Sequence, residues 1–173
     1  MPNYRRLFVP GGCWFFTVNL RDRSSGVLID CIDDLHRAIW QAQQKRPFHI
    51  DAWVVLPDHL HAIWTLPPGD NDFPSRWRDI KIAFSKSIPK GSERRVWQRG
   101  YWEHLIKDER DFNHHVAYCW FNPVKHEFVE SVEDWPHSSI HRDMADRPQP
   151  GDLERALAEY AERAGPSGYG EPS

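Results

Sequence analysis

Two histidines separated by one residue, His59 and His61, are the first candidates for chemistry. They begin an apolar run, residues 59–66, that is typical of a β-strand. Because side chains alternate between the faces of a strand, both imidazoles point to the same face, about 7 Å apart. That spacing suits two ligands of one metal ion, such as zinc, manganese or iron. The alternative is that the two rings only form hydrogen bonds on a polar sheet face.

A tyrosine and an asparagine, Tyr118 and Asn122, form the second candidate. Residues 109–121 have a helical pattern, and Asn122 precedes Pro123, where the helix is expected to end or bend. Positions four apart share a helix face, so the phenol and the amide project together. Tyrosine is a weak nucleophile because its pKa is about 10, and a divalent cation that polarises a phosphodiester would compensate. The alternative is that Tyr118 only packs against its neighbours.

The elements that must position these residues follow in the order β-α-β-β-α-β-α. Runs rich in aromatic and β-branched residues predict the strands, and apolar residues three or four apart predict the helices. The expected strands cover residues 13–20, 48–56, 59–66 and 96–106, and the expected helices cover residues 30–44, 74–88 and 109–121. This order predicts an α+β, ferredoxin-like fold, which is a four-stranded antiparallel sheet with helices on one face.

Length and composition indicate one catalytic domain, residues 1–147, followed by an acidic tail, residues 148–173. The 173 residues fit a single compact domain. The tail is expected to be partly helical, over residues 152–163, or disordered. No apolar run approaches the roughly 18 to 20 residues of a membrane span, and the three cysteines form no C-x-x-C pair. We therefore expect a cytoplasmic protein that makes no contact with membranes.

Charge is distributed unevenly along the chain. Residues 74–107 hold nine Lys or Arg against three acidic residues, whereas residues 127–173 hold four Arg against eleven acidic residues. A polyanion responds to the local basic surface rather than to the net charge of −3. The alternative is that both regions are simply solvated helix faces. The candidates for contacts with DNA phosphates are Arg5, Arg6, Arg76, Arg78, Lys81, Lys86, Arg94, Arg95, Arg99 and Lys125.

Five motifs follow one another from near the start of the chain to residue 139. They are Pro10-Gly-Gly-x-x-Phe-Phe-Thr17, Pro57-Asp-His-Leu-His-Ala-Ile-Trp64, Val96-Trp-Gln-Arg-Gly-Tyr-Trp-Glu-His104, Tyr118-x-x-x-Asn-Pro-Val-Lys-His126 and Asp134-Trp-Pro-x-Ser-Ser139. Together they resemble the REP-associated tyrosine transposases, relatives of the single-tyrosine transposases of small bacterial insertion sequences.

The resemblance implies the HUH nuclease fold and cleavage of one DNA strand beside a hairpin. It makes Tyr118 the nucleophile of a transient 5′-phosphotyrosine link that leaves a free 3′-hydroxyl. His59 and His61 become the metal-binding pair, assisted by Asn122, with Mg²⁺ or Mn²⁺ as the expected ion. The implied partner is single-stranded DNA with hairpins, bound by a monomer in preference to a homodimer, and we expect no nucleotide cofactor.

The sequence departs from the family pattern directly after Lys125. The family usually continues His-Gly-Leu-Val, whereas this chain has His126, Glu127, Phe128 and Val129. Glycine commonly occupies the left-handed position that ends a helix. Its loss leaves the end of the helix without a residue that adopts this conformation easily.

Residues near the candidates have secondary expected roles. Asp58 is placed to accept an N–H from a histidine ring, and Tyr101 is expected to pack in the sheet or stack on bases rather than act as a nucleophile. Packing is favoured over metal binding for His104. His114 and His115 are expected on the solvated surface of a helix.

Two other functions are compatible with part of the pattern. A histidine-triad nucleotide hydrolase also alternates histidines on a strand, but it needs a third where this chain has Ile63. A non-catalytic module that binds DNA hairpins would keep the basic segment and could lose the histidines or the tyrosine. This chain has the basic segment, the histidines and the tyrosine, which favours catalysis.

Overall fold

The computed structural model describes residues 7, 9–90, 95–146, 155 and 158. In chain order its elements are β1 (Cys13–Asn19), α1 (Val27–Asp30), α2 (Ile32–Lys45), β2 (His49–Val55), β3 (His59–Thr65), α3 (Phe73–Ser87), β4 (Trp102–Leu105), α4 (Glu109–Lys125), the 3-10 turn η1 (Val132–Asp134) and α5 (Ile140–Asp146). Among the described residues, no helix has both the length and the apolar character of a membrane span. The tail predicted from residue 148 lies outside the described residues, apart from residues 155 and 158.

The four strands form one antiparallel sheet in the order β2-β3-β1-β4. In the centre, β1 pairs with β3 so that Thr17 lies opposite His61 and Asn19 opposite His59. On its other side β1 pairs with β4, which places Phe15 opposite His104. The predicted ferredoxin-like order of elements is confirmed.

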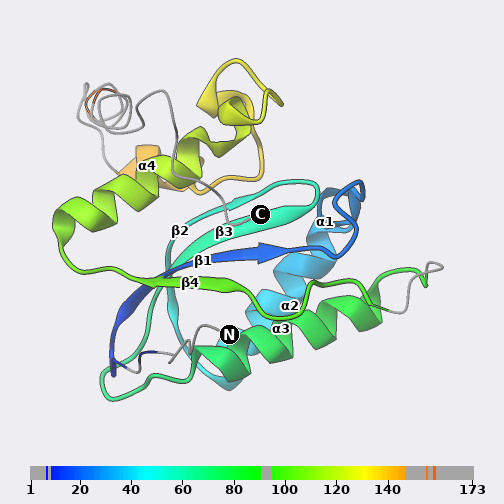
Figure 1. Ribbon diagram of the computed structural model, residues 1–173, viewed down its shortest axis with the longest axis horizontal. Helices are drawn as coiled ribbons and strands as arrows, with labels where there is room; N and C mark the ends of the chain where they lie inside the picture. The colour runs from blue at the N-terminus through cyan, green and yellow to red at the C-terminus, as the bar shows by residue number, and fades with distance from the viewer. Residues whose placement is uncertain (1–6, 8, 91–94, 147–154, 156–157, 159–173) are drawn as a thin grey trace, which may run out of the picture.

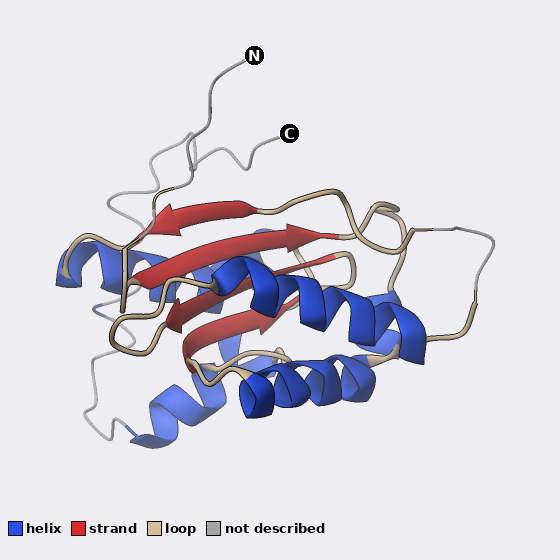
Figure 2. Ribbon diagram, turned by 90° about the horizontal axis from the view of Figure 1, so that it is seen from below, coloured by secondary structure: helices blue, strands red, loops and turns tan. Residues whose placement is uncertain are grey.

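Alternating side chains give the sheet two apolar faces, and each face has its own core. Trp14 and Phe16 pack with α2 and α3, while Phe15 and Ile63 pack with α4. Figure 1 shows α4 on one side of the sheet and α2 and α3 on the other, and Figure 2 shows two long helices side by side across the strands. The expectation that the helices share one face therefore holds for α2 and α3. The opposite face carries Phe15 and Ile63 among polar residues, together with Ala52 and Val54 of β2, and α4 covers these apolar side chains.

The predicted strand over residues 96–106 is shorter than expected. Only Trp102–Leu105 belongs to the sheet, and Trp97 makes an isolated bridge to Leu20. Gly100 has a φ of 78°, which interrupts the extended backbone between them. Aromatic residues over this segment suggested a continuous strand, but Trp97 instead packs in the core below the sheet and donates its indole N–H to the Lys81 carbonyl at 3.2 Å.

The end of α4 also differs from the prediction, because the helix runs through Pro123 to Lys125. Beyond it, the N–H of Phe128 donates to the carbonyl of Pro123 at 3.0 Å, and the N–H of Glu127 donates to that of Val124 at 2.9 Å. This pair of bonds is the Schellman motif, which requires a left-handed residue directly after the C-cap. Glu127 fills that position with a φ of 59°, so the glycine missing from the sequence is replaced by a strained glutamate.

Replacing Glu127 with glycine should stabilise the protein by about 0.5 to 1 kcal/mol. A non-glycine residue in the left-handed region costs roughly 1 to 2 kcal/mol, part of which the greater flexibility of glycine in the unfolded chain offsets. Urea denaturation of the wild-type chain and Glu127→Gly measures the change. Glu127→Ala is the control, since it removes the carboxylate and keeps the Cβ. An equal gain in both variants would assign the effect to charge and refute the backbone explanation.

Candidate active site

The two histidines of β3 face α4, as strand alternation predicts, and both are almost completely buried. His59 Nδ1 lies 2.8 Å from Asp58 Oδ1, and His61 Nδ1 lies 2.8 Å from Thr17 Oγ1. Their ring centroids are 5.0 Å apart. Contacts at Nδ1 fix the orientation of each ring and make Nε2 the nitrogen that a metal ion would take. The geometry at Asp58 is the one expected from the sequence.

Asp58 is held as a carboxylate. Burial favours its neutral form, but the hydrogen bonds from His59 and from Arg23, whose Nε lies 2.6 Å away, outweigh it and lower the pKa of Asp58 to about 2. A charged carboxylate accepts the N–H of His59 throughout the neutral pH range. This keeps the tautomer of His59 that presents Nε2 as a base.

His61 is held as a neutral imidazole. Its complete burial lowers the pKa of His61 well below the usual value, and the neighbouring groups His59, His126 and Lys125 lower it further. A neutral ring is the form that binds metal ions, since protonation occupies the nitrogen lone pair. The environment of His61 therefore favours metal binding over protonation.

Tyr118 lies on α4 directly against this pair. Its ring centroid is 5.0 Å from that of His61 and 5.7 Å from that of Phe15. The Nζ atom of Lys125, two helical turns further on, lies 5.2 Å from the centre of the tyrosine ring. A nearby positive charge favours the ionised form of a phenol, which is the nucleophilic form. The predicted convergence of Tyr118 with the two histidines is therefore present in the fold.

Asn122 completes the group, one helical turn beyond Tyr118. It is fully buried, and its amide interacts with His61, where it favours the protonated ring. Within the described residues, neither amide atom has a hydrogen bond of good geometry. Buried amides are normally satisfied, so this position fits a role as a ligand. Two imidazole nitrogens and an amide oxygen are suitable donors for a divalent metal ion.

A third histidine, His126, was not assigned a role from the sequence. Its ring centroid lies 5.1 Å from that of His59. The signal was present, since Tyr118, Asn122 and His126 follow one another at intervals of four and so share a helix face. The helix expected from the sequence stops before Pro123, so His126 does not appear on the helix face of Tyr118.

Most of the predicted DNA contacts lie away from Tyr118. Those on α3, which covers the opposite face of the sheet, are Arg76, Arg78, Lys81 and Lys86. Arg95 and Arg99 are exposed in the segment before β4. Arg5, Arg6 and Arg94 lie outside the described residues. Of the described candidates, Lys125 alone lies against the tyrosine ring.

Arg76 is a structural residue, and the prediction that it contacts DNA is wrong. Its side chain is 1% exposed. The guanidinium donates to both carboxylate oxygens of Asp70, at 3.1 and 2.6 Å, and to the carbonyls of Arg46, Pro47 and Asp72. All five N–H donors of the fork are used, so Arg76 has neither exposure nor a donor left for a phosphate. A basic helix pattern does not distinguish this arginine from its exposed neighbour Arg78.

Lys81 is also engaged within the protein. Its ammonium donates to the carbonyl of Gly100 at 2.6 Å and to that of Gln98 at 3.3 Å. It also lies 5.4 Å from the centre of the Tyr101 ring. Burial lowers the pKa of Lys81 to about 8. These contacts fasten the segment before β4 to α3, and they make Lys81 a weaker candidate for DNA binding than Lys86.

Comparison with known proteins identifies the family. The chain is 51% identical over 145 residues to the REP-associated tyrosine transposase of Escherichia coli (strain K12), covering 84% of this chain and 86% of that protein. The chain belongs to the REP-associated tyrosine transposases. A putative REP-associated tyrosine transposase of Haemophilus influenzae is 41% identical over 155 residues, covering 83% and 88% of the two chains. No family model matches this transposase.

A solved structure agrees with the fold. It is that of a REP-associated tyrosine transposase bound to a REP hairpin, and it is similar to this transposase with a TM-score of 0.82 and 49% sequence identity. The match covers 88% of this chain and 93% of that chain. The α+β architecture described above is therefore that of the family.

Substitution of Arg76 should destabilise the transposase. We expect Arg76→Ala to lower the free energy of unfolding by about 3 kcal/mol or more, or to prevent folding, because it leaves the buried side of Asp70 and three carbonyls without their donor. Denaturant titration measures this change. Arg78→Ala, on the exposed face of the same helix, should stay within about 0.5 kcal/mol of wild type. Normal stability of Arg76→Ala would contradict the structural role.

The burial of His61 should make stability depend on pH. In the unfolded chain His61 takes up a proton near pH 6.5, whereas in the folded chain its pKa is well below the usual value, so stability is lost as the pH falls. Between pH 7.5 and 5.5 this residue should cost about 1.4 kcal/mol. Urea titrations in chelator at both pH values measure it, with His61→Gln as the comparison. Equal losses in the two proteins would refute the assignment.

Proposed function

We propose that this transposase cuts one strand of DNA at REP-type hairpins through a 5′-phosphotyrosine link to Tyr118. The observation that carries the proposal is the position of the Tyr118 ring, 5.0 Å from the buried His61 and on the same face of the sheet as His59. The substrate follows from the relative of 49% identity that is bound to a REP hairpin.

In the proposed reaction, the Oη atom of Tyr118 attacks the scissile phosphorus. The new Tyr118 O–P bond forms as the P–O3′ bond breaks; the phenol loses its proton, and the departing 3′-oxygen takes one up to become a hydroxyl. Lys125, 5.2 Å from the ring, stabilises the phenolate. Because the 3′-hydroxyl is itself a nucleophile, its attack on the phosphotyrosine restores the phosphodiester. The same site therefore supports religation and strand transfer.

His59, His61 and Asn122 are the residues that would hold a divalent metal ion, with Mg²⁺ or Mn²⁺ as the proposed ion. Such an ion, when bound, neutralises charge on the phosphodiester in the transition state. Asp58 and Thr17 keep the two rings in the ligand orientation. His126, beside His59, is a further candidate donor.

The proposed site is complete within one chain. His59 and His61 come from β3 and Tyr118 and Asn122 from α4, which packs on β2 and β3 of the same chain. No residue of a second copy is needed to assemble them. This supports action as a monomer in preference to a homodimer.

Contacts with the hairpin are proposed to involve exposed basic side chains. Among the predicted DNA contacts that the structure describes, the exposed ones are Arg78, Lys86, Arg95, Arg99 and Lys125. Lys125 is the one beside Tyr118 and is assigned to the phosphates next to the cut. Binding through phosphates weakens as salt rises, because counterions are released from the DNA.

The test of the proposed chemistry is a covalent adduct between protein and DNA. Purified wild-type chain is incubated with labelled single-stranded DNA carrying a REP hairpin, with Mn²⁺ or Mg²⁺, and is analysed on a denaturing gel. We expect a metal-dependent adduct with the wild-type chain and its complete loss in Tyr118→Phe, which removes the attacking oxygen and keeps the ring.

Tyr101→Phe is the matched control. Tyr101 packs with Phe16 and Trp77 on the opposite face of the sheet, so its hydroxyl should have no part in the adduct. Adduct formation by Tyr118→Phe would refute the assignment of the nucleophile. Tight binding of the hairpin with no adduct or nick, across several flanking sequences and both ions, would instead favour a module that only binds DNA.

A further inference from the structure

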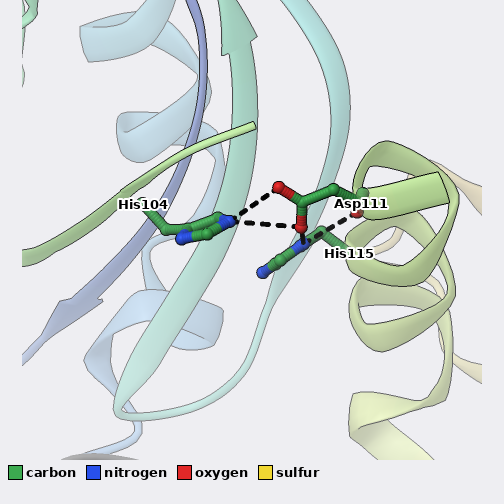
Figure 3. Close-up of side chains that lie close together, drawn as sticks. All are labelled: His104, Asp111 and His115. Atoms are coloured by element: carbon green, nitrogen blue, oxygen red, sulfur yellow. Dashed lines mark hydrogen bonds and ion pairs between the residues drawn. The ribbon is translucent and has the colours of Figure 1, made fainter. Parts of the chain in front are cut away.

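A second cluster of potential metal ligands lies outside the proposed active site. Figure 3 shows the side chains of His104, Asp111 and His115 meeting between β4 and α4. We propose that this cluster binds a transition metal ion of the zinc class and that the ion fastens α4 to the sheet. From the sequence alone, packing is expected for His104 and a solvated position for His115.

The ligand atoms are already close together. His104 Nε2 lies 2.9 Å from Asp111 Oδ2, and His115 Nδ1 lies 3.0 Å from Asp111 Oδ1. All three residues offer a ligand atom within 4.8 Å of the other two. Two ligands at about 2.1 Å from a tetrahedral zinc ion are about 3.4 Å apart, so small side-chain rotations would suffice for binding.

The donor set selects the class of ion. Two imidazoles and one carboxylate bind Zn²⁺ and its neighbours in the transition series more tightly than Mg²⁺ or Ca²⁺, which favour oxygen ligands. The side chains are 27%, 19% and 14% exposed in the order His104, Asp111, His115, so an ion can reach them from solvent. Three protein ligands leave a fourth position for water.

Capping of α4 explains only part of the arrangement. Asp108 is the N-cap and accepts the N–H of Asp111, and the Asp111 carboxylate accepts the N–H of Lys107 at 2.9 Å. An N-cap needs no histidine. The rings of His104 and His115 nevertheless stack, with centroids 4.7 Å apart and planes at 20°, and both contact the Asp111 carboxylate. Burial lowers the pKa of the His115 ring, and the neutral ring is the form that binds metal ions.

The position of the cluster indicates its role. His104 belongs to β4, while Asp111 and His115 belong to the first two turns of α4, so a bound ion would join the strand to the helix. Tyr118 lies on the same helix, one turn after His115. The Phe15 ring contacts both the His115 ring, at 4.7 Å, and the Tyr118 ring, at 5.7 Å. The ion would therefore act as a positioning element, separate from the reacting atoms.

The test uses the full chain, stripped with a chelator, in which His59→Ala and His61→Ala remove the other candidate site. Titration with Co²⁺ and Zn²⁺ is followed by calorimetry and by the visible absorption of tetrahedral Co²⁺. We expect one equivalent to bind and the Tm to rise by about 5 to 10 °C at a hundredfold excess over Kd. Adding His104→Gln and His115→Gln should abolish both signals, whereas adding His114→Gln should leave them unchanged.

Failure to bind Co²⁺ or Zn²⁺ by the folded His59→Ala, His61→Ala chain would overturn the proposal. If that variant does not fold, the wild-type chain is compared with His104→Gln, His115→Gln: loss of one equivalent supports the proposal, and an unchanged stoichiometry overturns it. The readouts are metal binding and Tm, so the result is independent of whether Tyr118 forms a DNA adduct.

Discussion

The antiparallel pairing of β1 with β3 fixes which side chains can meet at the candidate active site. With Thr17 opposite His61, the odd-numbered residues of both strands share one face, and that face carries His59, His61 and Phe15. A shift of one residue in either strand would reverse its faces. The apolar side chains on the other face, such as Trp14 and Trp64, oppose such a shift because they are buried against α2 and α3. The core between the sheet and α2 and α3 therefore keeps His59 and His61 on the opposite face.

The candidate active site also depends on where α4 lies on the sheet. Residues Val116 to Pro123 of α4 are all buried, and within this segment Tyr118 and Asn122 face the histidines. The helix has a definite start at Asp108 and a definite end in the Schellman motif at Glu127. The packing of this helix against β2 and β3 sets the position of Tyr118 on the sheet. The strained backbone of Glu127 is tolerated at the end of the same helix that positions the tyrosine.

Local periodicity predicted most of the elements, the shared face of His59 and His61, and the shared face of Tyr118 and Asn122, since each of these depends on spacing within one strand or helix. It was insufficient wherever partners distant in sequence decide the outcome. Arg76 appeared to belong to a basic surface, but its five donors are used by Asp70, Asp72, Arg46 and Pro47. The sequence predicted a solvated position for His115, but in the fold β4 places His104 beside it. Likewise, no pattern within residues 109–125 reveals which face of the sheet α4 covers.

The burial of Tyr118 has a consequence for selectivity. Only 9% of its surface is exposed, with His61 and Phe15 packed around the ring. Under the proposed function, a phosphate must reach the hydroxyl of a ring that is almost completely packed within the protein. Double-stranded DNA is stiff over about 150 base pairs and cannot bend a single phosphate inward at little cost, whereas an unpaired strand can. Under that function, the packing around the tyrosine would act as a steric filter that favours unpaired strands over duplex DNA before any base is recognised.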